Sequence, residues 1–174
     1  MAAPVDLQQH VRDVPDWPEP GVVFKDITPL LADPAAFASA IRRLADPFAG
    51  RGITKVVGIE ARGFLIGAPV ALHLGAGFVP VRKPGKLPGP THAEEYALEY
   101  GTDCVEIHAD AIEAAERVLI VDDVIATGGT AAATLRLVER LGGTVVGLGF
   151  VIELSFLGGR GRLDGHEHVS LLTY

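Results

Sequence analysis

Hydrophobic residues along the chain form short β-branched runs that alternate with stretches of helical spacing. The runs fall at 53–60, 78–82, 118–121 and 144–152, with a weaker one at 168–173. Apolar residues at helical spacing, closed by glycines, predict helices over about 34–48, 63–74 and 130–141. Because strand and helix alternate, the pattern predicts an α/β fold with a mostly parallel twisted sheet and helices on both faces.

Two segments interrupt this alternation. The segment 14–21 (VPDWPEPG) holds three prolines in eight residues and predicts an ordered but irregular entry to the domain. The segment 83–90 (KPGKLPGP) combines two lysines with three prolines and two glycines, so it is expected to be neither helix nor strand. Strand-like pieces at 96–100 and 105–108 follow it, with a turn expected at 101–103.

Composition narrows the class of protein. A chain of 174 residues, 48% hydrophobic and 21% charged, predicts one domain with a sizeable core. The net charge of −7 argues against nucleic acid or an anionic membrane as a partner, since either would need a basic face. The only cysteine, Cys104, has no partner for an intrachain disulfide, and neither a secretory signal nor a membrane span is visible. We therefore expect a cytoplasmic protein.

The most informative segment is 118–130 (VLIVDDVIATGGT), where a buried strand turns into a helix. Asp122 and Asp123 come where the strand is expected to leave the sheet, and their carboxylates would accept two hydrogen bonds from the vicinal hydroxyls of a ribose. The glycines that follow let backbone N–H groups approach an anion, and the helix N-terminus adds a favourable dipole. The segment lacks the G-x-x-x-x-G-K and G-x-G-x-x-G patterns of nucleotide sites. It predicts a sugar-phosphate site, the alternative being a plain strand exit with a helix cap.

Polar residues also follow the other expected strands. Three segments, 60–63, 82–90 and 122–130, come after strands of the predicted sheet. Ligands of open α/β sheets bind beyond the carboxyl ends of the strands, so these segments are expected to build one site.

The segment 118–130 resembles the signature of the type I phosphoribosyltransferases, which use 5-phosphoribosyl 1-pyrophosphate (PRPP). Further blocks, in the same order, are similar to the adenine-specific members of this family; they lie at 17–31, 61–64, 82–89 and 96–101. The resemblance implies transfer of the phosphoribosyl group from PRPP to adenine, which gives AMP and pyrophosphate in purine salvage. It also implies the type I phosphoribosyltransferase fold, Mg²⁺ as a cofactor and a homodimer.

The resemblance implies roles for individual residues. PRPP would contact Asp122, Asp123, Ala126, Thr127, Gly128, Gly129 and Thr130. Mg²⁺ would be held mainly by PRPP itself, with the two aspartates as the only candidate protein ligands. Pyrophosphate would contact Arg62, Gly63, Arg82, Lys83 and Lys86. Adenine would contact Val23, Phe24 and Lys25, and the catalytic candidates are Glu99, Arg62 and Lys86.

The resemblance also implies a division of the chain. Residues 1–174 form one phosphoribosyltransferase domain, in which about 1–32 make a hood that caps the base. Residues from about 83 to 95 make a flexible catalytic loop, which would close over pyrophosphate and expel water.

Plainer interpretations stay open where a residue is considered alone. Arg62 could be a solvated side chain at a helix start, Glu99 an ordinary strand residue and Phe24 part of the core. The basic segment could simply be exposed. The run 158–162 (GGRGR) resembles a short RNA-binding tract, but the acidic chain favours a structural turn.

Two other functions also remain open. The first is the same chemistry on hypoxanthine, guanine, xanthine or orotate, against which the block 17–31 and the run 98–101 argue. The second is a PRPP sensor that regulates transcription or RNA without catalysis. A sensor would keep 122–130 but could lose Glu99 and the loop lysines, which this chain retains, and it would need a basic face or a DNA-binding domain.

Overall fold

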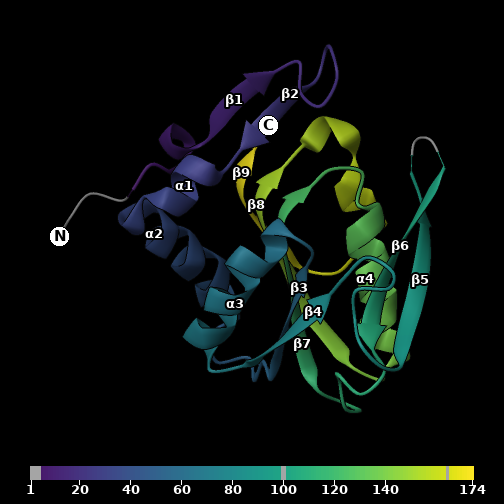
Figure 1. The fold of residues 1–174 in the computed structure, drawn as a ribbon. Helices are drawn as coiled ribbons and strands as arrows, with labels where there is room; N and C mark the ends of the chain where they lie inside the picture. Colours follow the sequence, from purple (N-terminus) through teal and green to yellow (C-terminus); the bar gives the residue numbers. More distant parts are fainter. Residues whose placement is uncertain (1–4, 99–100, 164) are drawn as a thin grey trace.

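A five-stranded parallel sheet forms the centre of the molecule (Figure 1). The computed structural model describes residues 5–98, 101–163 and 165–174. The strands lie in the order β4-β3-β7-β8-β9. Their bounds are Lys55–Ile59 for β3, Gly77–Val81 for β4, Arg117–Ile125 for β7, Thr144–Glu153 for β8 and His168–Thr173 for β9. The predicted parallel sheet is therefore confirmed, with the expected weak strand at one edge.

Helices cover both faces of this sheet, as the alternating pattern predicts. Helices α1 (Thr28–Ala32), α2 (Pro34–Ala45) and α3 (Arg62–Leu74) lie on one face, and α4 (Gly129–Arg140) lies on the other (Figure 1). Successive residues of β7 join different clusters, Ile120 packing on the α4 side and Leu119 on the opposite side. Burial on both faces explains why this strand is a continuous apolar run rather than an alternating one.

An antiparallel hairpin adds to the α4 side. Strands β5 (Thr91–Ala97) and β6 (Thr102–His108) pair along their length, and their buried residues join the α4 core. The expected strand at 96–100 was placed too late, since β5 begins at Thr91. The expected turn at 101–103 is also wrong in part, because Thr102 and Asp103 already belong to β6. The stretch 83–90 has no helix or strand, as predicted.

The N-terminal part has more regular structure than the sequence suggested. A short 3-10 helix, η1 (Leu7–His10), precedes two antiparallel strands, β1 (Arg12–Pro15) and β2 (Val23–Asp26). The prolines of the segment 14–21 lie at the end of β1 and in the connection, where a missing N–H removes no ladder bond from the centre of a sheet. The hairpin sits over α1 and the end of β9 (Figure 1).

Two element boundaries differ from prediction for local reasons. Helix α2 ends at Ala45 and a 3-10 turn, η2 (Asp46–Phe48), follows, because Pro47 cannot continue an α-helix. Strand β7 continues past Val121 to Ile125, paired with β8 as far as Glu153.

Two further 3-10 turns, η3 (Ser155–Leu157) and η4 (Gly159–Arg162), follow β8. None of the described helices is long and apolar enough to cross a membrane.

Candidate functional site

The three polar segments meet at one edge of the sheet, as predicted. Glu60 and Arg62 follow β3, Arg82 follows β4, and Asp122 and Asp123 lie near the end of β7. These strands are neighbours and parallel, so their carboxyl ends lie side by side. Contrary to expectation, the two aspartates are still part of the paired strand, which therefore holds their backbone in place.

Residues 126–130, called the phosphate loop below, line a small cavity of about 80 Å³ together with the end of β7 and the first turn of α4. Gly128 adopts a positive φ of 78° and caps α4. The first N–H groups of a helix have no partner within it, so this cavity suits an anion. The predicted location of the phosphate cradle is thus matched by a cavity at the start of a helix.

The phosphate loop packs backbone to backbone against the run 158–162. A Cβ added at Gly128 would overlap the carbonyl oxygen of Gly159, and one added at Gly159 would overlap that of Ala126 and lie 2.8 Å from the Gly128 nitrogen. The GGRGR run is therefore a structural turn, as expected, and it supports the loop. Sequence reasoning missed this support, because a close approach between glycines so far apart leaves no local pattern.

The two aspartates have different surroundings. The Asp122 carboxylate lies against α3, where a Cβ added at Gly63 would come within 2.6 Å of its Oδ1. That oxygen also accepts a hydrogen bond of 2.9 Å from the Asp123 N–H. Burial, together with the nearby Asp123 charge, raises the pKa of Asp122 well above its usual value. The Asp122 side chain thus packs against Gly63 at the start of α3, and Asp122 also lines the cavity of the phosphate loop.

Asp123 faces the cationic side of the site. Its side chain is 8% exposed, and its Oδ2 lies 2.6 Å from Nε of Arg62. The alignment of this ion pair is not that of a hydrogen bond, and Oδ2 has no hydrogen-bond donor among the residues that the structure describes. A buried carboxylate oxygen without a donor is rare in folded proteins and can accept one from a ligand.

Arg62 joins the N-terminal hairpin to the centre of the sheet. Besides its ion pair with Asp123, its guanidinium lies 4.8 Å from the centre of the Phe24 ring. Trp17 contacts the same ring edge-on, with 4.4 Å between ring centres. Three residues predicted to contact different parts of the substrates, namely Phe24, Arg62 and Asp123, are thus brought together in space.

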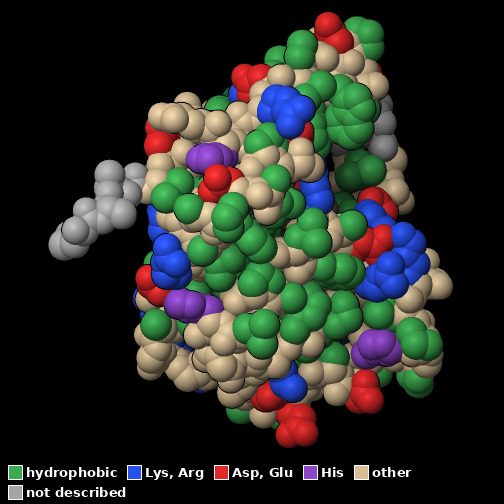
Figure 2. All heavy atoms as spheres, turned by 60° about the vertical axis from the view of Figure 1, so that its left-hand side comes forward, with side chains coloured by type: hydrophobic (Ala, Val, Ile, Leu, Met, Phe, Trp, Pro, Cys, Tyr) green, Lys and Arg blue, Asp and Glu red, His purple; other side chains and the backbone are tan. Residues whose placement is uncertain are grey.

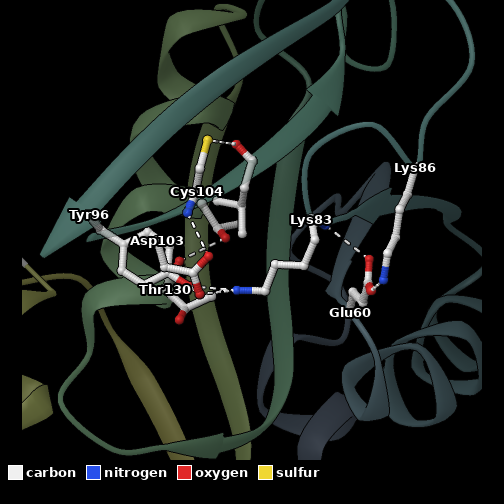
Figure 3. Close-up of polar contacts among 9 residues, drawn as sticks. Glu60, Lys83, Lys86, Tyr96, Asp103, Cys104 and Thr130 are labelled. Atoms are coloured by element: carbon white, nitrogen blue, oxygen red, sulfur yellow. Dashed lines mark hydrogen bonds and ion pairs between the residues drawn. The ribbon is translucent and has the colours of Figure 1, made fainter. Parts of the chain in front are cut away.

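Glu60 holds the basic loop, defined here as residues 82–90 (Figure 3). One carboxylate oxygen accepts hydrogen bonds from Arg82 Nε at 3.1 Å and from the Lys83 N–H at 2.9 Å, and the other forms an ion pair with Lys86. Burial opposes ionisation, but the contacts with Lys86 and Lys83 hold the pKa of Glu60 below its usual value. Sequence reasoning did not identify this role for Glu60.

Lys83 turns to the other side of the basic loop. Its ammonium pairs with Asp103 and lies 3.1 Å from the Tyr96 hydroxyl, which donates to Asp103 at 3.0 Å (Figure 3). Burial opposes ionisation of Asp103 too, but bonds from Lys83, the Cys104 N–H and Tyr96 keep its pKa below the usual value. The Tyr96 ring packs against the phosphate loop, because a Cβ added at Gly129 would lie 2.9 Å from a carbon of that ring.

The three adenine candidates do not share one face of β2. Phe24 contacts Arg62, while the Lys25 ammonium lies 2.6 Å from Asp13 and 4.0 Å from the centre of the Tyr174 ring. Val23 and Lys25 line a cavity of about 650 Å³. Its other lining residues include Leu154, Phe156 and Leu157, which sequence reasoning missed. Alternation along a strand explains the split.

Two further predictions concern Glu99 and the metal ion. Glu99 lies outside the described residues. Within the described ranges, no group of three or more His, Cys, Asp or Glu residues is placed to hold a metal ion.

Comparison with known proteins identifies relatives over nearly the whole chain. The family of phosphoribosyl transferase domains matches residues 24–166. The adenine phosphoribosyltransferase of Myxococcus xanthus is 61% identical over 97% of this chain and 92% of its own length. The crystal structure of the Rhodothermus marinus adenine phosphoribosyltransferase is 60% identical and superposes with a TM-score of 0.93, covering 97% of this chain and 96% of that one.

A more distant relative was solved with ligands bound. The Saccharomyces cerevisiae adenine phosphoribosyltransferase, solved with adenine and an imino-altritol bisphosphate, is 44% identical with a TM-score of 0.90. The match covers 95% of this chain and 96% of that one.

Proposed function

The chain belongs to the adenine phosphoribosyltransferase family, and from this premise we propose how its site performs the reaction. It transfers the 5-phosphoribosyl group from PRPP to adenine, giving AMP and pyrophosphate in purine salvage. The observation that carries the assignment of the site is the phosphate loop at the end of β7, with an acidic residue and a set of cations on neighbouring strand ends.

PRPP binds along the end of β7 in this proposal. The 5-phosphate lies on Ala126, Thr127, Gly128, Gly129 and Thr130, where backbone and hydroxyl donors surround the small cavity. Asp123 accepts hydrogen bonds from the ribose hydroxyls, since its Oδ2 is buried and lacks a donor. Asp122 packs against Gly63 and lines the same cavity, so it stays a second candidate contact of PRPP.

We propose Mg²⁺ as the cofactor, bound mainly through PRPP. Asp123 would offer the ion a buried carboxylate, whose Oδ2 is ion-paired with Arg62 and has no hydrogen-bond donor among the described residues. Since no cluster of three such ligands occurs in the part of the chain that the structure describes, the ion would take most of its ligands from phosphates and water. When bound, Mg²⁺ would neutralise part of the charge on the pyrophosphate group.

The cations around Glu60 and Asp123 receive the leaving group. Arg62 lies at Asp123, and Arg82 and Lys86 lie at Glu60. Lys83, now beside Asp103, would join them by leaving that carboxylate, and the Gly63 backbone at the start of α3 would add a donor. Negative charge develops on pyrophosphate as its bond to the anomeric carbon breaks, and fixed cations stabilise it. Arg62 and Lys86 are therefore assigned as catalytic residues.

Adenine binds at β2 in this proposal, against Phe24 and the backbone of Val23 and Lys25. The Lys25 side chain is engaged by Asp13 and Tyr174, so backbone groups rather than its ammonium would contact the base. Glu99 stays our candidate for proton transfer or charge stabilisation at the reacting centre. Residues from about 1 to 32 would act as the hood and about 83 to 95 as the flexible loop, in a cytoplasmic enzyme.

A homodimer is proposed on the outer face of α2 and α3. Leu65 and Leu72 of α3 are 52% and 82% exposed, and two apolar hollows of about 530 and 580 Å³ adjoin them. Figure 2, which brings this side forward, shows hydrophobic side chains gathered on it. Such a contiguous apolar surface is typical of an interface. Leu72→Glu should therefore give monomers in analytical ultracentrifugation, and an unchanged dimer would refute this location.

The function is tested with a panel of bases. Wild-type protein is incubated with PRPP, Mg²⁺ and adenine, hypoxanthine, guanine, xanthine or orotate, and pyrophosphate release is followed. Adenine should give the highest kcat/KM. Preference for another base would overturn the adenine assignment, and PRPP binding without turnover of any base would favour the sensor. Glu99→Gln should lower kcat more than it changes the affinity for PRPP, and an unchanged kcat would remove Glu99 from the mechanism.

A further inference from the structure

Each side-chain cation of the basic loop already has a carboxylate partner. Lys86 and Arg82 pair with Glu60, and Lys83 pairs with Asp103. Neither carboxylate was assigned a contact with substrate. Glu60 is the more buried, its side chain being 11% exposed, and it also accepts the Lys83 N–H. Arg82 pairs by its backbone with Glu106, but the rest of the loop, which carries Lys83 and Lys86, contains no helix or strand.

We propose that Glu60 and Asp103 are positioning residues that hold the cations of the basic loop until pyrophosphate replaces them as the partner. The proposal rests on the assignment of this loop to the pyrophosphate group. Binding of PRPP would then be an exchange, in which Lys86 and Lys83 leave a carboxylate for a phosphate oxygen. Departure of pyrophosphate would be the reverse exchange, assisted by the returning carboxylates.

The geometry favours exchange over permanent attachment. The Lys86 and Lys83 side chains are 48% and 36% exposed, so each can leave its carboxylate without unpacking the core. Ion pairs of such exposed side chains contribute little to stability, so a multiply charged phosphate group can outcompete them. The Glu60 backbone is anchored at the end of β3, so its carboxylate stays close to the loop when a cation leaves.

The proposed exchange predicts the direction in which the affinity for pyrophosphate should change. Glu60→Gln keeps the size of the side chain and an oxygen that can accept the Lys83 N–H, but it removes the charge that competes with pyrophosphate. Pyrophosphate should therefore bind the variant more tightly, by about two- to fivefold if the competing pair has the strength of an exposed one. If Glu60 only braced the loop, its loss would disorder the cations and weaken binding.

The test titrates Mg²⁺-pyrophosphate into the intact protein by calorimetry and measures steady-state kinetics in parallel. For Glu60→Gln we expect tighter pyrophosphate binding, a lower KM for PRPP and a kcat that is lower because product leaves more slowly. Asp103→Asn, which releases Lys83, should shift binding in the same direction. This second variant decides the question if the first does not fold.

The matched control is Glu106→Gln. Glu106 accepts the Gly85 N–H of the basic loop at 3.1 Å but forms no ion pair among the described residues. Removing its charge should change pyrophosphate affinity by less than the Glu60 substitution does. Equal or weaker binding by Glu60→Gln, or an equal gain in Glu106→Gln, would overturn the proposal. A wild-type protein that binds pyrophosphate but turns over no base would instead refute the proposed function.

Discussion

The phosphate loop and the basic loop, to which we assign the two anionic groups of PRPP, are built in opposite ways. The phosphate loop is held by its own backbone, which meets Gly159 so closely that neither partner tolerates a Cβ. The basic loop pairs by its backbone with Glu106 only at Arg82, and its cations are held by side chains, through ion pairs that join them to Glu60 and Asp103. One is a fixed cavity at a helix start, and the other is a set of cations with exchangeable partners.

This difference matches what each loop has to do. The 5-phosphate stays on the ribose throughout the reaction, so a rigid cradle loses nothing by being permanent. Pyrophosphate must be bound tightly enough to stabilise its developing charge and must then leave. Internal carboxylates that compete for the same cations limit the affinity for the product.

The largest expected effect comes from a substitution that disrupts the backbone contact between the phosphate loop and Gly159. Gly159→Ala places a Cβ against the Ala126 carbonyl oxygen and 2.8 Å from the Gly128 nitrogen, and neither backbone atom can move freely. We expect a loss of about 2–3 kcal/mol in the free energy of unfolding, the cost of overpacking, and at least a tenfold rise in the KM for PRPP. Urea unfolding and initial-rate kinetics measure the two effects.

Gly161→Ala is the control for that substitution, since a Cβ at Gly161 meets nothing within 4 Å. It should leave both quantities close to wild type. If Gly159→Ala behaved like Gly161→Ala, the phosphate loop would not depend on backbone contact, and the contrast between the two loops would disappear.

A smaller effect should separate the two adjacent aspartates. Asp123→Asn removes a charged acceptor for the ribose hydroxyls, and hydrogen bonds to charged groups are worth about 1.5–3 kcal/mol. We therefore expect kcat/KM for PRPP to fall by about 10- to 100-fold. Asp122→Asn should cost less than about fivefold, because asparagine keeps an oxygen that can accept the Asp123 N–H, and Asp122 forms no ion pair among the described residues. Equal losses from the two substitutions would contradict the division of roles.

The same contrast shows what the sequence could predict. The sheet, its helices and the phosphate loop follow from periodicity, glycine placement and order along the chain, which are local properties. The role of Glu60 could not be read in this way, since its partner Lys86 is 26 residues distant in sequence. The same holds for Asp103, which was expected in a turn and instead lies in β6 opposite Tyr96.

The N-terminal hairpin was missed for a related reason. Its strands are only four residues each, and the prolines between them read as irregular chain. The pairing depends on contacts such as Trp17 with Phe24, which join residues on either side of the turn. Side-chain pairings of this kind require the fold to be known first.

The smallest expected effect is on the pH dependence of stability, and it concerns Glu60, which holds the basic loop. The pKa of Glu60 in the folded protein lies below its ordinary value of 4.5, so the ionised carboxylate stabilises the fold. This contribution is fully present above the unfolded value and is lost as the pH falls through the lower, folded pKa. Wild type should therefore be more stable than Glu60→Gln by about 1 kcal/mol at neutral pH, since the lysine partner is half exposed. Urea midpoints measured at decreasing pH below 4.5 should converge as Glu60 is protonated. If the difference between the two urea midpoints stayed constant as the pH fell, Glu60 would act through packing rather than charge. The basic loop would then resemble the phosphate loop more than we propose.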